Sequence, residues 1–121
     1  MTLSNPIFMR ISLLICSAFV SALVLDAHAI LKESIPAQGA VLQGPEITVK
    51  LKFNSRIDAV HSRMYLDNGA GPRAIDIVKQ ESPDTLVGQA KQVMPGDYRV
   101  EWQVLAIDGH ITRGELPFKV R

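Results

Sequence analysis

The chain has 121 residues, enough for one domain, and its 13 Lys and Arg nearly balance its 12 Asp and Glu, for a net charge of +1. The sequence contains no basic block and no basic stripe interleaved with aromatic residues, so an electrostatic nucleic-acid-binding surface is excluded. It also has no acidic or basic tail that would indicate a charged partner.

The first segment has the layout of a secretory signal peptide. A cation precedes an apolar run over residues 11–25, and small residues follow around Ala27 and Ala29. The run is shorter than the roughly 20 residues of a membrane-spanning helix, which favours cleavage over an uncleaved anchor. We therefore predict that this segment is a signal peptide that is cleaved from one mature domain.

The cleavage point decides which residue begins the mature chain. Cleavage after Ala27 leaves His28 at the N-terminus, whereas cleavage after Ala29 discards it. The signal-peptide pattern alone slightly favours the second cut, because Leu25 is bulky where the first cut needs a small residue. The only cysteine, Cys16, lies within the signal segment. Burial of apolar surface, alone or with a metal, must therefore hold the mature fold together.

Short alternating segments separated by turn residues fill the mature chain. Apolar and polar side chains alternate over residues 47–53, which places them on opposite faces of a strand. The same pattern runs over residues 98–106, where Trp102 is expected in the core. Such a pattern predicts an all-β sandwich or barrel in a single domain. Weaker strands are expected at residues 29–34, 63–66, 74–78, 85–88 and 116–120.

Two places in the mature chain could supply metal ligands. An N-terminal His28 would offer its amine and its ring Nδ1, which together close a chelate ring, and such nitrogen donors suit Cu(II). The tripeptide Asp108–Gly109–His110 follows the strongest strand, so both functional side chains should lie at a strand end or turn. His110 could add a nitrogen, and Asp108 could add an oxygen or hold a water or a ring nitrogen. Asp-Gly is also a common turn dipeptide, so the tripeptide alone is compatible with an ordinary turn.

The other candidate residues fit structural roles better. His61 has no carboxylate or histidine at a useful spacing, and it is expected to be a solvated surface residue. Met64 and Met94 stand alone, whereas a Cu(I) site needs several sulfur ligands, so both are expected to pack. The sequence offers no nucleophile turn and no glycine-rich phosphate loop. These features disfavour a catalytic function.

Two long segments resemble the CopC family of periplasmic copper-resistance proteins. HAILKESIPAQGAVLQGPEITVKLKFNSRI, residues 28–57, resembles the mature start of the family. Residues 94–120 resemble its closing hairpin, with Pro-Gly-x-Tyr-x-Val-x-Trp-x-Val, Asp-Gly-His and Gly-x-x-x-Phe-x-Val. The resemblance implies an immunoglobulin-like Greek-key β-sandwich or barrel, a periplasmic location, and Cu(II) bound by His28, Asp108 and His110. It also favours cleavage after residue 27, because family members begin with His-Ala. The resemblance thus implies a signal peptide over residues 1–27 and a CopC-like copper-binding domain over residues 28–121.

The chain departs from some CopC relatives in two ways. Met94 is the only methionine near the position of the methionine-rich Cu(I) site of those relatives, so no such site is predicted. Residues 54–56 read Asn-Ser-Arg where some relatives carry an acidic residue after the Leu-x-Phe strand.

The function expected from the resemblance is that of a soluble periplasmic Cu(II) carrier or buffer in copper resistance or homeostasis, and not an enzyme. Its partners would be copper and an inner-membrane copper importer or another periplasmic copper protein. One alternative is a metal-free immunoglobulin-like binding module, whose stability and spectrum copper would not change. The other is a copper monooxygenase, which the chain resembles only in having an N-terminal histidine and a second histidine.

Overall fold

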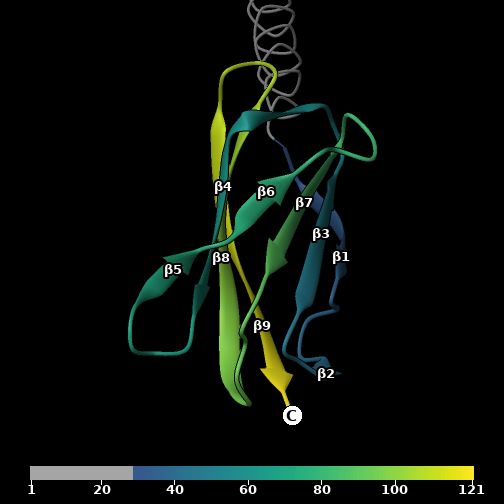
Figure 1. The fold of residues 1–121 in the computed structure, drawn as a ribbon. Coiled ribbons are helices and arrows are strands. Elements are labelled where there is room, and N and C mark those ends of the chain that lie inside the picture. The colour runs from purple at the N-terminus through teal and green to yellow at the C-terminus, as the bar shows by residue number, and fades with distance from the viewer. Residues whose placement is uncertain (1–28) are drawn as a thin grey trace, which may run out of the picture.

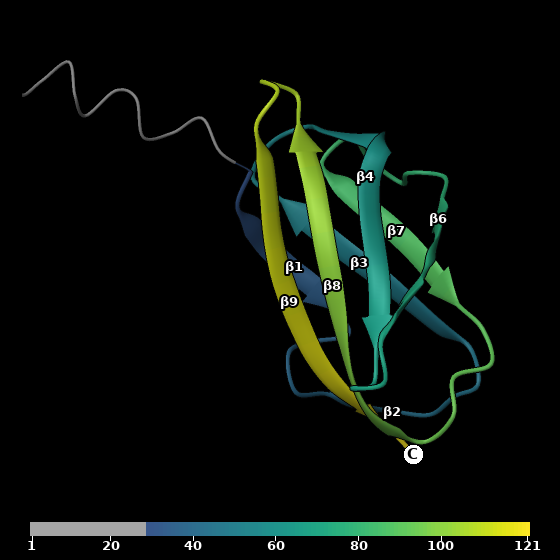
Figure 2. The ribbon, with the colours of Figure 1, turned by 90° about the vertical axis from the view of Figure 1, so that its left-hand side faces the viewer.

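The computed structural model describes residues 29–121, which fold as two facing β-sheets (Figures 1 and 2). One sheet has the strand order β1-β3-β7-β6 and the other has the order β2-β9-β8-β4-β5. The strands are β1 (Leu31–Ile35), β2 (Val41–Leu42), β3 (Ile47–Phe53), β4 (Ile57–Asp67), β5 (Pro72–Ala74), β6 (Asp76–Val78), β7 (Thr85–Ala90), β8 (Gly96–Ala106) and β9 (Ile111–Val120).

The predicted all-β, immunoglobulin-like Greek-key sandwich in one domain is confirmed. The chain crosses between the sheets from β1 to β2, from β2 to β3, from β3 to β4, from β5 to β6 and from β7 to β8, so both sheets are built from distant parts of the sequence. Among residues 29–121, no helix is long and apolar enough to cross a membrane.

Most predicted strands lie where the alternation of apolar and polar residues put them. β3 has the bounds predicted for it, and β8 begins two residues before the predicted Tyr98. The segment over residues 74–78, predicted as one strand, is divided between β5 and β6. Buried Ile75 separates the two, and its backbone N–H donates to the carbonyl of Met64. The chain passes from one sheet to the other at Ile75, so the segment over residues 74–78 contributes to both sheets.

The core lies between the inner faces of the sheets. In β8, Val100, Trp102 and Val104 point inward, and they are buried together with Phe53 from β3. The rings of Trp102 and Phe53 meet edge to face, with centroids 5.3 Å apart and an interplanar angle of 71°. The opposite residue on β9 is Gly114. A Cβ at Gly114 would lie only 2.2 Å from Cζ2 of Trp102, so the indole fits only because that position has no side chain.

β4 contains a bulge close to its start. Asp58 pairs with Leu105 on β8, but the next paired residue of β4 is Arg63, opposite Gln103. Buried Ser62 holds the bulge, since its hydroxyl donates to the Asp58 carbonyl (2.6 Å) and accepts from the Leu105 N–H (3.1 Å). A bulge adds unpaired residues to a strand and re-aims their side chains. Residues 59–62 are therefore freed from the regular alternation of the sheet.

Candidate metal centre

The turn between β8 and β9 forms one end of the sandwich (Figure 1). The N–H of Ala106 donates to the carbonyl of His110, and the N–H of Gly109 donates back to the carbonyl of Ala106, both at 2.9 Å. Gly109 has φ of +91°, a conformation that residues with a Cβ rarely adopt. The glycine therefore permits the tight reversal that brings the residues on either side of it together.

Asp108 and His110 form a close carboxylate–imidazole pair at the turn. Oδ2 of Asp108 lies 3.0 Å from Nδ1 of His110, and Oδ1 accepts the backbone N–H of His110 at 3.0 Å. An ionised carboxylate can only accept hydrogen bonds, so in the neutral ring this contact places the proton on Nδ1 and the lone pair on Nε2. That tautomer is the one in which a histidine held by a carboxylate binds a metal.

The start of the described chain is fastened to the same end of the sandwich. Ala29 is buried, and Ile30 exchanges two hydrogen bonds with Asn54: Ile30 N–H donates to Oδ1 (2.8 Å), and Asn54 N–H donates to the Ile30 carbonyl (3.0 Å). The loop that contains Asn54 also meets the β8–β9 turn, because the N–H of Ile107 donates to the carbonyl of Arg56 (3.3 Å). This loop therefore links the chain start to the turn.

The third predicted ligand, His28, lies outside the described residues, as does the predicted signal peptide. Within residues 29–121, no group of three or more His, Cys, Asp or Glu side chains is placed to hold a metal ion. The structure thus brings together two of the three predicted ligands, Asp108 and His110, and it holds Ile30, two residues after His28, at their end of the sandwich.

A second carboxylate–imidazole pair was missed from the sequence. The side chain of His61 is exposed, as predicted, but the expectation that it had no carboxylate partner was wrong. Its Nδ1 lies 2.7 Å from Oδ2 of Asp58, and its backbone N–H donates to Oδ1 at 3.2 Å. The hydrogen bond from His61 is the main reason that the pKa of Asp58 is lowered. The signal in the sequence was a carboxylate three residues earlier, which becomes a neighbour only because of the β4 bulge.

The two methionines of the described chain lie in different environments. Met64 is buried in the core, in agreement with its predicted packing role. Met94 is 69% exposed, so it lies at the surface and not in the core; both positions were compatible with the prediction. Its backbone carbonyl accepts a 2.6 Å hydrogen bond from the Tyr98 hydroxyl.

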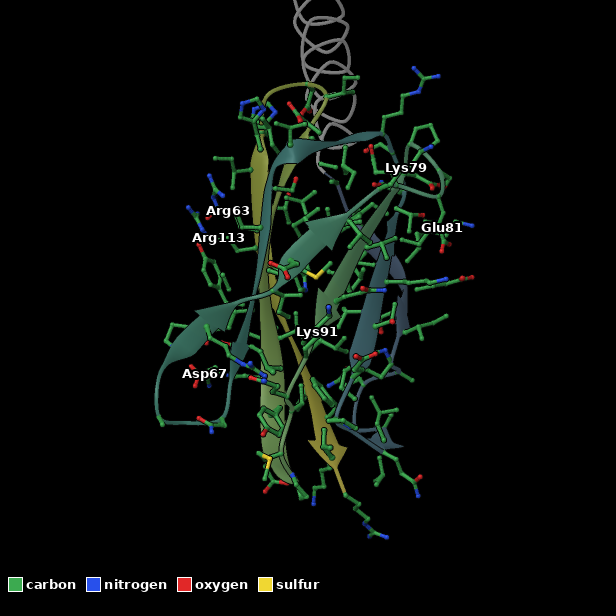
Figure 3. The ribbon with its side chains drawn as sticks, in the orientation of Figure 1. Arg63, Asp67, Lys79, Glu81, Lys91 and Arg113 are labelled. Atoms are coloured by element: carbon green, nitrogen blue, oxygen red, sulfur yellow. The ribbon has the colours of Figure 1, made fainter. Side chains whose placement is uncertain are left out.

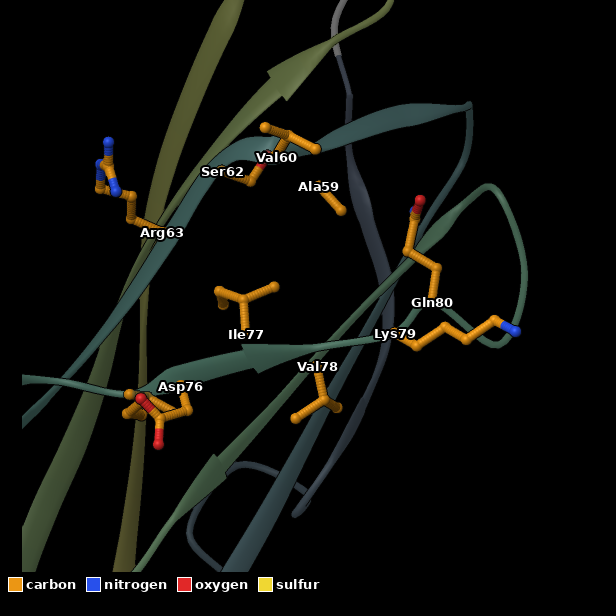
Figure 4. Close-up of a pocket in the computed structure, with 10 residues that line it drawn as sticks. Ala59, Val60, Ser62, Arg63, Asp76, Ile77, Val78, Lys79 and Gln80 are labelled. Carbon is orange, nitrogen blue, oxygen red and sulfur yellow. The ribbon is translucent and has the colours of Figure 1, made fainter.

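A groove of about 550 Å³ runs between β4 and β6, beside the bulge (Figure 4). Val60, Ser62 and Arg63 line one side, and residues 76–80 line the other. Ile77 and Val78 add apolar surface, whereas Asp76 and Lys79 carry opposite charges. None of the predicted metal ligands lines this groove, so it is separate from the β8–β9 turn.

Charged side chains on the outer face of the five-stranded sheet interact with one another. Arg63 and Arg113 lie on this face (Figure 3), and both are opposite Gln103 in the strand register. Farther along β8, Arg99 contacts Asp67 (3.4 Å) and Glu101 (3.1 Å). The negative charge of Glu115 and the contact with Asp67 raise the pKa of Arg99.

Solved structures of copper-resistance proteins share this fold. CopC from Methylosinus trichosporium OB3b superposes with a TM-score of 0.67 at 29% identity, over 77% of this chain and 93% of that one. PcoC from Escherichia coli, described as a methionine-rich copper resistance protein, superposes with a TM-score of 0.64 at 25% identity. That match covers 78% of this chain and all of PcoC (100%).

Two curated relatives match the chain at similar identity. Protein YobA of Escherichia coli (strain K12) is 28% identical over 102 residues, which is 78% of this chain and 80% of YobA. The copper transport protein CutJ of Bacillus subtilis (strain 168) is 27% identical over 99 residues. The chain spans only 18% of the length of CutJ.

The family model of the CopC domain matches residues 31–121, which is nearly all of the described chain. It covers both the β3 strand and the hairpin with the Asp108–His110 pair. These matches support a function related to copper. By sequence and by fold, this chain belongs to the CopC family.

Proposed function

We propose that the mature protein is a periplasmic carrier or buffer that binds one Cu(II) ion. In this proposal, residues 1–27 are a signal peptide and His28 is the first residue of the mature chain. The ion is held by the amine and ring Nδ1 of His28 and by Nε2 of His110, with Asp108 beside the ring. Nitrogen donors of this kind suit Cu(II), which has the highest affinity among the divalent first-row metals.

The single observation that carries the proposal is the contact between Asp108 and His110. The carboxylate fixes the tautomer and the direction of the ring before any metal arrives, so little ordering is needed on binding. The hydrogen bonds between Ile30 and Asn54 support the role of His28, because they fasten the chain close to it. The copper proteins among the relatives agree with the choice of metal.

Intact mass and copper titration of the exported protein test this proposal. We expect a mature chain that begins at His28 and binds one Cu(II) tightly, and we expect His110→Ala to lower the affinity at least tenfold. His61→Ala serves as the matched control and should keep the tight site. A mature chain that begins at residue 30, or equal affinities of the wild type and His110→Ala, would contradict the proposal. If copper changed neither the melting temperature nor the spectrum of the protein, the metal-free binding module would be the better account.

We further infer that copper passes between this end of the sandwich and a membrane copper transporter. Four large aliphatic side chains are exposed on segments close to this end: Ile30 just before β1, Val60 in the β4 bulge, Ile107 in the hairpin turn and Ile111 at the start of β9. Exposed apolar surface is typical of regions that bind other proteins. In CutJ, a segment similar to this chain is part of a much longer copper transport protein.

Replacement of Val60 and Ile107 by Asp tests the transfer surface. Neither residue is a proposed ligand, so the Cu(II) affinity should stay within about twofold of the wild type. Transfer to membranes that contain the transporter should slow several-fold. The pair Ile35→Asp and Val41→Asp, also exposed but not among these four residues, is the control. Equal transfer rates for both double variants would remove this surface from the proposal.

The site supports binding rather than catalysis. The carboxylate of Asp108 stands directly beside the imidazole, and no other function is required to account for the two groups. Copper-dependent peroxide turnover by the loaded protein well above that of free copper would favour the monooxygenase alternative.

A further inference from the structure

The loop between β4 and β5 contains the dipeptide Asn68–Gly69, and no other asparagine of the chain is followed by glycine. Both residues are exposed, as are Ala70 and Gly71, which complete the loop. An asparagine before glycine is unusually prone to spontaneous deamidation, because glycine has no Cβ to hinder the approach of its nitrogen to the asparagine side chain. This loop is therefore where such chemistry is expected first.

Deamidation here joins the backbone nitrogen of Gly69 to the side-chain carbonyl carbon of Asn68. As the nitrogen attacks Cγ, the bond from Cγ to Nδ2 breaks, and the proton of the Gly69 N–H leaves with Nδ2 as ammonia. Solvent water then opens the cyclic imide. The product has an aspartate or an isoaspartate at position 68, so the net charge of the chain falls by one.

Hydrogen bonds hold both reacting groups in the folded loop. The N–H of Gly69 donates to Oδ1 of Asp67 at 2.7 Å, and Oδ1 of Asn68 accepts the N–H of Ala70 at 3.0 Å. Gly69 has φ of +95°, a conformation that residues with a Cβ rarely adopt. The turn thus requires the same residue type that makes the Asn68 side chain reactive.

The carboxylate of Asp67 opposes the attack (Figure 3). It is ionised at neutral pH, since its pKa is lowered, mainly by the hydrogen bond from Gly69. The Gly69 nitrogen becomes a nucleophile as its proton leaves, and the negative charge that develops on it lies 2.7 Å from a carboxylate oxygen. Like charges at this distance repel strongly. Asp67 is 7% exposed and contacts Arg99 at 3.4 Å, which keeps the carboxylate in this position.

We propose that Asn68 is a site of spontaneous deamidation and that Asp67 restrains the reaction in the folded protein. Asp67 acts on Asn68 only through the Gly69 N–H, so it is a positioning residue and not a reactant. The loop lies far from the proposed copper site, because Asp67 pairs with Arg99, six residues before Leu105 at the other end of β8. The modification should therefore leave Cu(II) affinity unchanged.

Peptide mapping by mass spectrometry during long incubation of the mature protein at neutral to mildly alkaline pH tests this inference. We expect slow conversion of Asn68 in the folded wild type. In urea, conversion should be on the order of tenfold faster, the rate equivalent of one hydrogen bond to a charged group. Asp67→Asn keeps the shape of the side chain but removes its charge, so it should raise the folded-state rate several-fold. Asn68→Asp gives the reference mass and charge of the product.

Two controls separate the charge of Asp67 from general effects. Asp97→Asn removes a carboxylate whose side chain is 84% exposed, at the start of β8, and should leave the rate at Asn68 unchanged. Asn54, which is followed by serine and holds Ile30, reports loosening of the fold, and its conversion should be equally slow in the wild type and in Asp67→Asn.

Three results would overturn the inference. The first is an Asn68 side chain that stays intact even in urea. The second is an equal rate in the folded and the unfolded wild type, or in the folded wild type and Asp67→Asn. The third is an equal acceleration at Asn54 and Asn68 in Asp67→Asn, which would assign the effect to lost stability and not to the carboxylate.

Discussion

Asn54 holds Ile30 through two hydrogen bonds: its side-chain Oδ1 accepts the Ile30 N–H, and its backbone N–H donates to the Ile30 carbonyl. Asn54 stands after the Leu-x-Phe strand, in the stretch where an acidic residue is expected in some relatives. Its amide oxygen is engaged with the backbone two residues after His28. In this chain the position therefore fastens the N-terminal segment instead of offering a carboxylate.

Asn54→Ala should weaken Cu(II) binding without removing a ligand. The loss of one hydrogen bond of about 0.5–1.5 kcal/mol releases the segment that carries His28, so we expect an affinity about 2- to 10-fold lower. Calorimetry or competition with a chelator would measure the change. Asn68→Ala is the matched control, since the Asn68 side chain accepts the N–H of Ala70 in a different loop. If both variants bind Cu(II) as tightly as the wild type does, the hydrogen bond between Asn54 and Ile30 has no part in metal binding.

Asp108→Asn should lower the Cu(II) affinity about 10- to 100-fold, because an amide does not require Nδ1 of His110 to be the donor and no longer fixes the tautomer. The melting temperature of the metal-free protein should stay close to that of the wild type, since the pair lies on an exposed turn. The comparison with Asp97→Asn controls for the change in net charge. An unchanged affinity for Asp108→Asn would show that the carboxylate does not support the site.

Gly114→Ala should destabilise the fold by about 1–3 kcal/mol, because a Cβ would lie 2.2 Å from Cζ2 of Trp102 and 2.5 Å from its Cε2. Urea unfolding would measure the loss. Trp102→Phe removes the colliding atoms, and within the described residues Nε1 of Trp102 is buried with no hydrogen-bond partner to lose. When Trp102→Phe is also present, Gly114→Ala should therefore lower the free energy of unfolding by less than it does alone. If the losses in free energy of unfolding of the two single variants simply add in the double variant, atoms other than those of Trp102 shift to relieve the collision.

Asp67 should make the fold sensitive to acid. The N–H of Gly69 donates to its carboxylate at 2.7 Å, and this bond is the main reason that the pKa of Asp67 is lowered, with Arg99 contributing as well. A group with a lowered pKa in the folded state binds fewer protons there than in the unfolded state. Its contribution is therefore complete above its ordinary pKa of 3.8 and declines as the pH falls below it.

Asp67→Asn tests this contribution. The wild type should be more stable than the variant at pH 7, and the difference should shrink as the pH falls below about 4. Urea unfolding at several pH values would show it, with Asp97→Asn as a control from the same sheet. A difference that stays constant down to pH 2 would contradict the assignment.

The alternation of side chains predicted those strands that have one buried face. β3 and β8 lie in the middle of their sheets, so every second residue faces the core and the period of two is plain. β2 was not predicted, because two residues paired in parallel with the end of β9 carry no period. The position of Asp108 and His110 at a turn was predicted, since it depends only on local sequence, whereas their direct contact was one of several roles considered for Asp108.

The contacts that depend on irregular backbone were not predictable. Asp58 and His61 would point to opposite faces of a regular strand, and only the bulge held by Ser62 brings them together. Likewise, the link between Asn54 and Ile30 joins residues 24 positions apart and requires the β1–β3 pairing. No periodic pattern in the sequence indicates either contact.

The β8–β9 hairpin has a consequence for the rates of copper exchange. Its two strands are paired from Gly96 and Val120 at one end to Leu105 and Ile111 at the other, so the turn stands on a continuous ladder. Ile30, by contrast, precedes β1 and is held by a single asparagine. In the proposed site, the ion can then leave by displacement of the N-terminal side alone, while every strand pairing stays intact. Copper exchange would be independent of the unfolding rate, so a stable protein can still give up its ion quickly.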